Sequence, residues 1–332
     1  QCGPAKEEIL TCEIDLSEAE PAREAALSRR DPEFYSLIAS PLSRLPALSQ
    51  REKSWSLPSL ECYTGLVRFA FCSAEEYAGK AAQAVRLCQK ANCRLTVLPY
   101  AKGLDLSALL SRIQEAVRPD HAVIAGYGER EASLIRSGQI TFFQKRLDRR
   151  VEEIFPGVTG AVSFDGEPAV PENVRIQMLA GADFTVWFDD GDLPYYRPLM
   201  QTRAAENKMY LLRATPSSSG FSLACNPDGA VMTTTFCCGE QIVFALLFTA
   251  ARKCKTVVPG TDILTSRRPS AYELLAQEQP SASYIMSVFQ QSAGKHVYSS
   301  GKNTVVVYKQ NFHGYLRIPF LIKYNCRRVF CK

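Results

Sequence analysis

The side chains best suited to nucleophilic attack or metal binding are the cysteines, of which the chain has twelve. They form no C-x-x-C pair, and two short spacings, Cys88 with Cys93 and Cys326 with Cys331, have no histidine partner nearby. A structural zinc ion takes four cysteine or histidine ligands, so no metal and no other cofactor is expected. A chain of 332 residues is large enough not to need disulfides, and we expect mostly reduced thiols in an intracellular, reducing compartment, cytoplasm or organelle matrix.

The three histidines lie too far from acids and nucleophiles in the sequence to suggest a catalytic triad. We interpret His121, His296 and His313 as structural or exposed. The net charge of +5 is mild and the basic residues are scattered, which argues against nucleic-acid binding. The longest apolar run, Ile242–Ala251, is shorter than the ~20 residues of a bilayer span, so no membrane span is expected.

Helical and strand-like patterns alternate from residue 66 onward. Apolar runs of strand length are separated by longer segments with apolar residues at helical spacing. The elements predicted for this half are a strand Leu66–Cys72, a helix Ala74–Ala91, a strand Arg94–Pro99, a helix Leu106–Val117, a strand His121–Tyr127, a turn at Ser137-Gly138 and a strand Gln139–Gln144. The first three make a β-α-β unit.

The alternation resumes after a Gly/Pro-rich stretch from Pro156 to Pro171. The elements predicted there are a helix Glu172–Ala180, a strand Phe184–Phe188, a helix Leu199–Lys208, a strand Met209–Ala214, a strand Gly220–Asn226 entering the turn Asn226–Gly229, and a later strand Thr304–Lys309. Such an order predicts an α/β sandwich.

An internal repeat lies outside that pattern. Residues 7–10 with 29–39 match residues 240–243 with 267–276 after one gap, and each copy has paired arginines before an aromatic residue. Because the chain begins Gln1-Cys2-Gly3-Pro4, without an initiating Met or a signal pattern, it is expected to be a processed or truncated product. The expected division is a tail over 1–40 from a preceding domain of a tandem precursor, a linker over 41–65, a domain over 66–276 and an extension of unknown fold over 277–332. Chance similarity of two short segments is the alternative.

Three segments, in order, resemble the carbon–nitrogen hydrolase (nitrilase) superfamily. They are Ala81–Tyr100, then Pro171–Arg175 with Leu179–Asp183, and then Arg203–Ala214 followed by Ser219–Ser222 and Asn226–Gly229. The resemblance spans roughly residues 66–276, and its third segment is the most specific. It implies a nitrilase-like α-β-β-α sandwich, and the repeated segments at 29–39 and 267–276 look like two copies of the family's C-terminal arm.

The resemblance also implies a carboxylate base, a lysine and a thiol nucleophile. The base position after Leu98-Pro99 holds Tyr100, whose phenol, with an ordinary pKa of ~10, does not readily deprotonate a thiol. The nucleophile position holds Asp165, and a carboxylate is a poor nucleophile toward amides. Lys145 fits the lysine position. These positions indicate a degenerate catalytic triad.

Two further features support that interpretation. No cysteine lies between Cys93 and Cys225. The interval from Lys145 to Asp165 is shorter than in the family and lacks the stretch that would carry a second active-site glutamate, for which Glu152 and Glu153 are the nearby substitutes.

The expected function is a catalytically inactive nitrilase-like domain that serves as a structural or interaction subunit. The resemblance implies a protein partner or a homo-oligomer through the 199–214 helix–strand surface, with interface candidates Arg203, Glu206, Asn207, Tyr210 and Arg213. Two alternatives stay open. One is an active hydrolase of an amide or nitrile, and the other a small-ligand module whose remnant pocket contains Tyr100, Lys145, Asp165 and Glu172.

Overall fold

The computed structural model divides into two compact units, one of residues Phe34–Ala276 and one of Gln1–Glu33 with Gln277–Lys332. The residues that it describes are 21, 24–25, 28, 30–48, 60–69, 73–101, 106–128, 131–143, 151–189, 195–216, 220–236, 239–248, 254–276, 297–299, 304–308, 319–323 and 330–331. The unit Phe34–Ala276 contains all the candidate residues of the sequence that are described.

The first sheet of this unit has six strands in the order β12-β1-β2-β3-β4-β5. Their bounds are β1 Glu61–Arg68, β2 Leu95–Val97, β3 Ala122–Tyr127, β4 Glu131–Arg136, β5 Gln139–Phe143 and β12 Gln241–Phe248. β1, β2 and β3 run parallel, as expected for strands joined by helical crossovers. β12 closes one edge by pairing antiparallel with the whole of β1, from Glu61 opposite Phe248 to Arg68 opposite Gln241.

The second sheet also has six strands, in the order β11-β10-β9-β8-β7-β6. Their bounds are β6 Glu152–Phe155, β7 Val158–Phe164, β8 Phe184–Phe188, β9 Tyr210–Ala214, β10 Leu223–Cys225 and β11 Val231–Thr234. β7, β8 and β9 are parallel and buried along their whole length. Strands covered on both faces are typical of α/β layers.

Two pairs of helices cover the sheets. The pairs are α4 Ala74–Lys90 with α5 Leu106–Ala116, and α6 Pro171–Leu179 with α7 Tyr196–Asn207. α4 begins with a capping box in which Ser73 and Glu76 satisfy each other's backbone N–H groups. α6 begins with Pro171, whose fixed φ suits the first turn, and α7 ends at Lys208 in the left-handed conformation.

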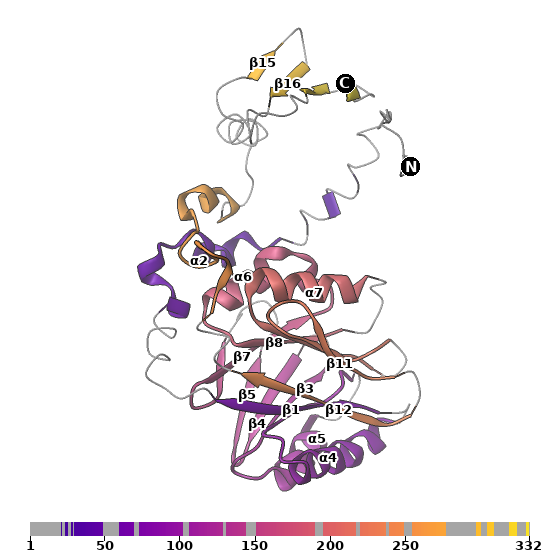
Figure 1. Cartoon of the computed structure of the whole chain (residues 1–332). Coiled ribbons are helices and arrows are strands. Elements are labelled where there is room, and N and C mark those ends of the chain that lie inside the picture. The colour runs from indigo at the N-terminus through magenta and orange to yellow at the C-terminus, as the bar shows by residue number, and fades with distance from the viewer. Residues whose placement is uncertain are drawn as a thin grey trace, which may run out of the picture. The chain divides into compact units, whose positions relative to one another are not determined.

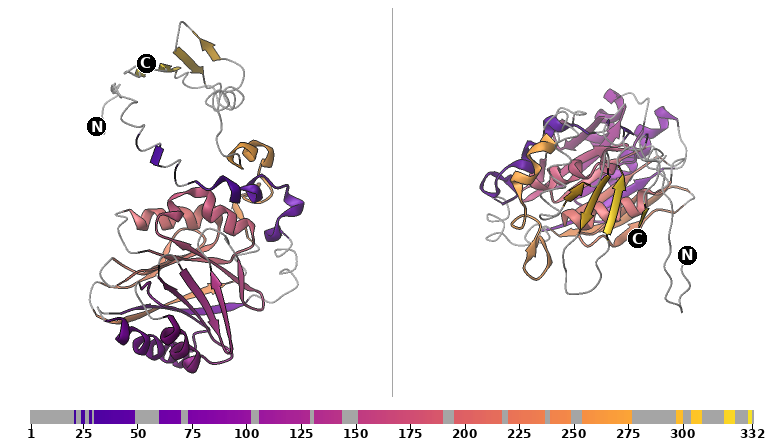
Figure 2. Two further views of the ribbon diagram at one scale, coloured as in Figure 1. Left: turned by 180° about the vertical axis from the view of Figure 1, so that it is seen from behind. Right: turned by 90° about the horizontal axis from the view of Figure 1, so that it is seen from above.

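Three apolar layers hold these elements together. The middle layer lies between the sheets and includes Leu66, Ile124, Val186 and Leu212. One outer layer joins α4 and α5 to the first sheet, and the other joins α6 and α7 to the second. Figure 1 shows the helix pairs on opposite sides of the two sheets, and Figure 2 shows the same order from behind. The predicted α-β-β-α sandwich is confirmed.

Two terminal segments of this unit pack on the α6 side. The first contains α2 Ser36–Ala39 and η3 Leu42–Arg44, preceded by η2 Pro32–Phe34 at the unit boundary; the second contains β13 Thr256–Val258, β14 Thr261–Asp262 and η6 Pro269–Ala276. We call residues 34–48 the N-terminal arm and residues 261–276 the C-terminal arm. The arms share the α6 layer: Tyr35 is fully buried and Ile38 nearly so.

The boundaries of several elements differ from the expected ones. The compact unit begins at Phe34 instead of residue 66, because the N-terminal arm packs into its core. The expected linker 41–65 contributes η3 and the first half of β1, which extends from Glu61 because β12 pairs with it there. The origin of residues 1–40 in a tandem precursor stays a prediction.

Strands β4, β6, β7 and β11 were not predicted. β7 lies inside the Gly/Pro-rich stretch, where Gly160 is required because an added Cβ would lie 2.6 Å from the Phe184 ring. Within the described ranges, every helix falls short of the length and apolar character that crossing a bilayer demands.

The other unit contains a four-stranded antiparallel sheet. Its strands are β15 Val297–Ser299, β16 Thr304–Tyr308, β17 Pro319–Lys323 and β18 Phe330–Cys331. β16 matches the predicted strand Thr304–Lys309 closely.

Candidate functional site

Tyr100, at the position where the resemblance places the base, follows β2 and is buried, with 1% of its surface exposed. Its hydroxyl donates a hydrogen bond of 2.8 Å to the carbonyl oxygen of Gly128. The preceding residue is fixed from α4, because the hydroxyl of Tyr77 donates to the carbonyl oxygen of Pro99 at 2.5 Å. The phenol of Tyr100 is therefore a hydrogen-bond donor that connects the segment after β2 to the segment after β3.

Asp165, at the nucleophile position, is the first residue after β7. Its φ of +46° lies in the left-handed region, which is uncommon for a residue other than glycine. Its backbone N–H donates to the carbonyl oxygen of Phe188 at 2.8 Å, and its own carbonyl accepts from the Trp187 indole at 2.7 Å. Glu167 fixes the end of β7 by accepting from the N–H of Phe164 at 2.9 Å. The turn is thus rigidly held.

Aromatic rings connect these two positions. Phe188 stacks with Phe164 at 5.9 Å between ring centroids and lies 6.1 Å from the ring of Tyr100. All three are buried, and an added Cβ on Gly126 would lie 2.6 Å from the Phe188 ring. We call Tyr100, Phe164 and Phe188 the aromatic cluster. It brings Tyr100 and the turn at Asp165 to the same end of the sandwich and fills the space beside them with ring atoms.

The other predicted catalytic positions lie elsewhere or outside the described residues. Lys145 is not among the described residues, and β5 ends shortly before it at Phe143. Glu152 and Glu153 are on β6 at the edge of the second sheet, where Glu153 accepts from the N–H of Gly157 at 3.1 Å. Glu172 is on the first turn of α6 and faces a different cavity, described below.

Five cysteines are free thiols with a described environment: Cys62, Cys88, Cys93 and Cys225 are buried, and Cys254 is exposed. Burial raises the pKa of Cys62 and of Cys225 to about 11 in each case. A hydrogen bond from Cys93 lowers the pKa of Cys88, whose fully buried sulfur would lie 2.5 Å from an added Cβ on Gly65.

His121 is a structural histidine, which is one of the two roles expected from the sequence. Its ring nitrogens lie 2.9 Å from the hydroxyl of Thr96 and 2.8 Å from the carbonyl oxygen of Cys93. Burial lowers its pKa, which keeps the ring neutral. His296 and His313 lie outside the described residues.

Two of the arginines expected at an interface point inward. Arg203 donates to the carbonyl oxygens of Pro168 at 2.6 Å and Ala169 at 3.1 Å. Arg213 is fully buried and forms a forked ion pair with Asp189, with N–O distances of 2.6 and 2.7 Å. The guanidinium of Arg213 also stacks 3.9 Å from the ring centroid of Tyr196 on α7. These charges hold the layers of one chain together.

The remaining interface candidates are buried or half-buried. Asn207 is fully buried and donates to the carbonyl oxygen of Arg203 at 2.8 Å. Tyr210 belongs to the middle layer, where burial raises its pKa. Glu206 is half-buried and accepts from Arg203 at 2.9 Å. Arg203, Asn207, Tyr210 and Arg213 are therefore internal residues, which corrects the expectation that they contact a partner directly. They shape the 199–214 surface, and the role of that surface as an interface stays a prediction.

The two copies of the arginine–aromatic repeat meet in the structure. Arg267, from the C-terminal arm, donates to the carbonyl oxygens of Leu37, Ile38 and Ser40 at the end of α2. The carbonyl oxygen of Leu37 also accepts from the backbone N–H of Ser40 at 3.2 Å, and carbonyls at a helix end are well suited to further donors such as a guanidinium. Sequence reasoning matched the two copies, but their contact depends on the folded chain.

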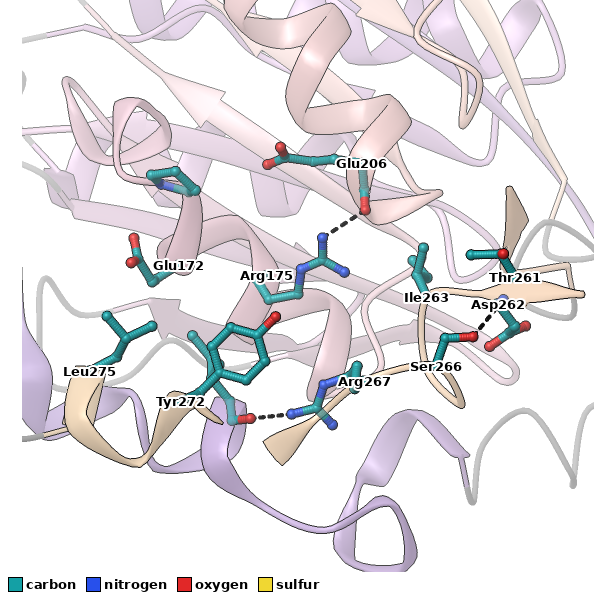
Figure 3. A pocket seen from close by; sticks show the side chains of 12 residues that line it. Glu172, Arg175, Glu206, Thr261, Asp262, Ile263, Ser266, Arg267, Tyr272 and Leu275 are labelled. Carbon is teal, nitrogen blue, oxygen red and sulfur yellow. Dashed lines mark hydrogen bonds between the residues drawn. The ribbon is translucent and has the colours of Figure 1, made fainter. Parts of the chain in front are cut away.

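A cavity of about 360 Å³ opens where the arms meet α6 and α7. We call it the arginine cavity, after Arg175 and Arg267 (Figure 3). Its other lining residues are Ile38, Pro171, Glu172, Glu206, Thr261, Asp262, Ile263, Ser266, Tyr272 and Leu275. Sequence reasoning named neither arginine as a site residue, since far-apart segments form the cavity.

The layer order, the parallel strands and the two helix pairs define a sandwich of the nitrilase kind. No protein-family model and no curated protein sequence matches the chain. Among solved structures, a variant amidase from Nesterenkonia sp. AN1, with the acetamide moiety of fluoroacetamide added to its active-site cysteine, aligns with a TM-score of 0.51. The identity is 16%, over 58% of this chain and 92% of that chain.

Two further structures complete the comparison. An amidase from Nesterenkonia sp. aligns with a TM-score of 0.51 and 17% identity over 62% of this chain and 93% of that chain. Nit3 of Saccharomyces cerevisiae, from branch 10 of the nitrilase superfamily, aligns with a TM-score of 0.49 and 13% identity over 58% and 92% of the two chains. At these identities the likeness to the Nesterenkonia amidases shows the fold alone, and that fold resembles the one of the carbon–nitrogen hydrolase (nitrilase) superfamily.

Proposed function

We propose that this chain is a nitrilase-like domain that lacks thiol-dependent hydrolase activity and serves as a structural or interaction subunit of a larger assembly. The observation that carries the proposal is the aromatic cluster at the position of the implied base. Tyr100 is buried there, donates to a backbone carbonyl and packs against Phe188, which packs in turn against Phe164. A substrate amide would have to displace these rings.

The chemistry of the two positions supports the same conclusion. A phenol has an ordinary pKa of ~10 and at neutral pH remains a donor, whereas a general base must accept a proton. Asp165 offers a carboxylate in place of the thiolate that attacks a carbonyl carbon. The buried thiols Cys62 and Cys225 have raised pKa values and remain neutral, which makes them poor nucleophiles.

The role in assembly is supported by the surface that the internal arginines shape. Arg203 holds α7 against the segment at Pro168 and Ala169, and Arg213 of β9 stacks on Tyr196 of α7. Tyr195, Arg197 and Thr202 are exposed. A second copy of this chain or another protein is the occupant proposed for the exposed side of the 199–214 surface.

The catalytic part is tested by mass spectrometry of the intact chain after treatment with fluoroacetamide, together with a hydrolysis screen of small amides and nitriles. The Nesterenkonia variant known to carry the acetamide adduct is the positive control. We expect no turnover. A single stoichiometric adduct with turnover would refute the proposal and favour the active hydrolase.

The assembly part is tested by sedimentation of the full chain and of Thr202→Arg, which places a charge on the outer side of α7. Arg86→Asp, on the exposed side of α4, is the matched control. We expect an oligomer that Thr202→Arg weakens and Arg86→Asp leaves intact. A wild-type monomer that cross-links to no partner through α7 would contradict this role.

A further inference from the structure

The arginine cavity contains two guanidinium groups whose hydrogen-bond acceptors are backbone carbonyls. Within the described residues, Arg175 has one hydrogen bond, to the carbonyl oxygen of Glu206 at 2.8 Å. The bonds of Arg267 go to carbonyls at the end of α2. A guanidinium has five N–H donors in a planar fork, so both residues are positioned with donors left over. Figure 3 shows the two groups near the Tyr272 ring.

The two guanidinium groups of the cavity are partly desolvated and lie close enough to affect each other. Burial lowers the pKa of Arg175 and of Arg267, the charge of Arg175 lowers that of Arg267 further, and the carboxylate of Glu206 acts in the opposite direction on Arg175. Two like charges in a partly desolvated space repel each other, and a bound anion would relieve both the repulsion and the desolvation.

The acidic residues of the lining limit the charge of that anion to one. Glu206 accepts from Arg203 at 2.9 Å, and Asp262 accepts from the N–H groups of Leu264 at 2.9 Å and Thr265 at 3.1 Å. These carboxylates accept hydrogen bonds from protein donors beside the cavity. Glu172 adds a third. A dianion such as phosphate would meet more repulsion here than a carboxylate.

The lining also has an apolar part, beside the polar residues Thr261 and Ser266. Ile38 comes from the N-terminal arm, Ile263 and Leu275 come from the C-terminal arm, and the partly exposed Tyr272 adds the face of an aromatic ring. A ligand with a carboxylate that accepts two hydrogen bonds from an arginine, and with a compact apolar body that packs against the apolar residues, would match both the charged and the apolar part of the lining.

We propose that the arginine cavity is a binding site for a monocarboxylate with a compact apolar or aromatic body, held by Arg175 and Arg267. The ligand is either a free small acid or the C-terminal residue of a peptide, which presents the same chemistry. The cavity lies in the α6 layer, whereas the aromatic cluster lies at the inter-sheet core, so this proposal stands or falls separately from the loss of hydrolase activity.

The test is a ligand-detected NMR titration of the full chain with benzoate and with N-acetylphenylalanine. Benzamide and N-acetylphenylalanine amide are the neutral controls, and inorganic phosphate is the dianion control. We expect both acids to bind at least tenfold more tightly than their amides and than phosphate. Tighter binding of N-acetylphenylalanine would identify a peptide C-terminus as the source, and tighter binding of benzoate a free acid.

Variants separate the site from the fold. Arg175→Gln is expected to weaken acid binding at least tenfold, as is Arg267→Lys, which keeps a donor for the α2 carbonyls but loses the fork. Arg86→Gln, an exposed arginine of α4, is the matched control, and thermal unfolding checks that each variant is folded. Amides that bind as well as the acids, arginine variants that bind like wild type, or no binding of any acid would overturn the proposal.

Discussion

Arg213 illustrates how a charged residue becomes part of a core. It lies on β9 with its side chain on the outer face of the second sheet, where Asp189 supplies both carboxylate oxygens and the Tyr196 ring covers the guanidinium. Removing one partner of such a pair leaves the other charge buried, which costs more than the pair contributes.

Arg213→Met is therefore expected to reduce the free energy of unfolding by about 3–5 kcal/mol, the usual cost of breaking a buried pair. The measurement is urea denaturation. Arg197→Met, an exposed arginine at the start of α7, is the control and should change the free energy by less than about 0.5 kcal/mol. Similar small effects in both variants would show that the pair is hydrated in solution.

The buried thiols give stability a dependence on alkaline pH. The pKa of Cys62 is raised from an ordinary value of 9.0 to about 11, so the unfolded chain loses this proton before the folded chain does. The stability contributed by the neutral thiol is fully present below pH 9 and is lost as the pH rises toward about 11. At about 1.4 kcal/mol per pKa unit, the loss is about 2–3 kcal/mol.

Urea denaturation at pH 8, 9, 10 and 11 measures this loss. Cys62→Ala cannot titrate at this position, so its stability should fall less steeply over this range, although the variant is less stable at pH 8 because of the cavity. Parallel curves for wild type and Cys62→Ala would contradict the assignment.

At the residue scale, the sequence was informative about chemistry and uninformative about orientation. Tyr100 was placed correctly after a strand because Leu98-Pro99 marks that position, whereas the strand that precedes Asp165 was not predicted. Arg203 and Arg213 were expected at an interface because the family resemblance implies one at the 199–214 surface. Their acceptors at Pro168 and Asp189 belong to other elements, and only the folded chain brings them together.

At the element scale, the close approach of strands is fixed by small residues. Gly160 lies in β7 directly opposite Phe184 of β8, and the Phe184 ring covers the place that a side chain would take. Gly79, by contrast, lies on the exposed side of α4, where an added Cβ would meet no atom within 4 Å.

Substitution of these two glycines by alanine is expected to change the free energy of unfolding in opposite directions. Gly160→Ala should reduce the free energy of unfolding by about 1–3 kcal/mol, because the new methyl group overpacks the core. Gly79→Ala should raise it by about 0.5–1 kcal/mol, because alanine restricts the unfolded chain and favours a helix. Thermal unfolding of the two variants compares them directly, and equal destabilisation by both would contradict the packing argument.

Amphipathic helices and strands bounded by turns were predicted well, because their periodicity is visible. β8 was predicted with the bounds that the structure has, and α4 to within one residue. β7 was missed because both of its faces are buried and its small residues, Gly160, Ala161 and Ser163, look like a loop. β11 lies at an edge with mixed burial and gives a weak pattern.

At the scale of the whole molecule, the N-terminal arm completes the α6 layer. Tyr35 and Ile38 pack with residues of α6, and Arg267 ties α2 to the C-terminal arm. An arm so placed covers apolar surface that α6 would otherwise expose.

Truncation tests this directly. A chain that begins at Phe34 should keep the melting temperature of the full chain, whereas one that begins at residue 49 loses the N-terminal arm. The second should melt several degrees lower and self-associate, since deletion of the buried Tyr35 alone costs about 3–5 kcal/mol. Differential scanning calorimetry and sedimentation are the measurements. Equal melting temperatures would mean that the arm does not support the core.

The position of the N-terminal arm has a consequence for synthesis. The arm leaves the ribosome more than a hundred residues before α6, the helix that it packs against. At roughly 5–20 residues per second, the aromatic and aliphatic side chains of the arm wait on the order of ten seconds in water before their binding surface exists. During that interval a chaperone, or a domain already folded, has the first opportunity to bind them.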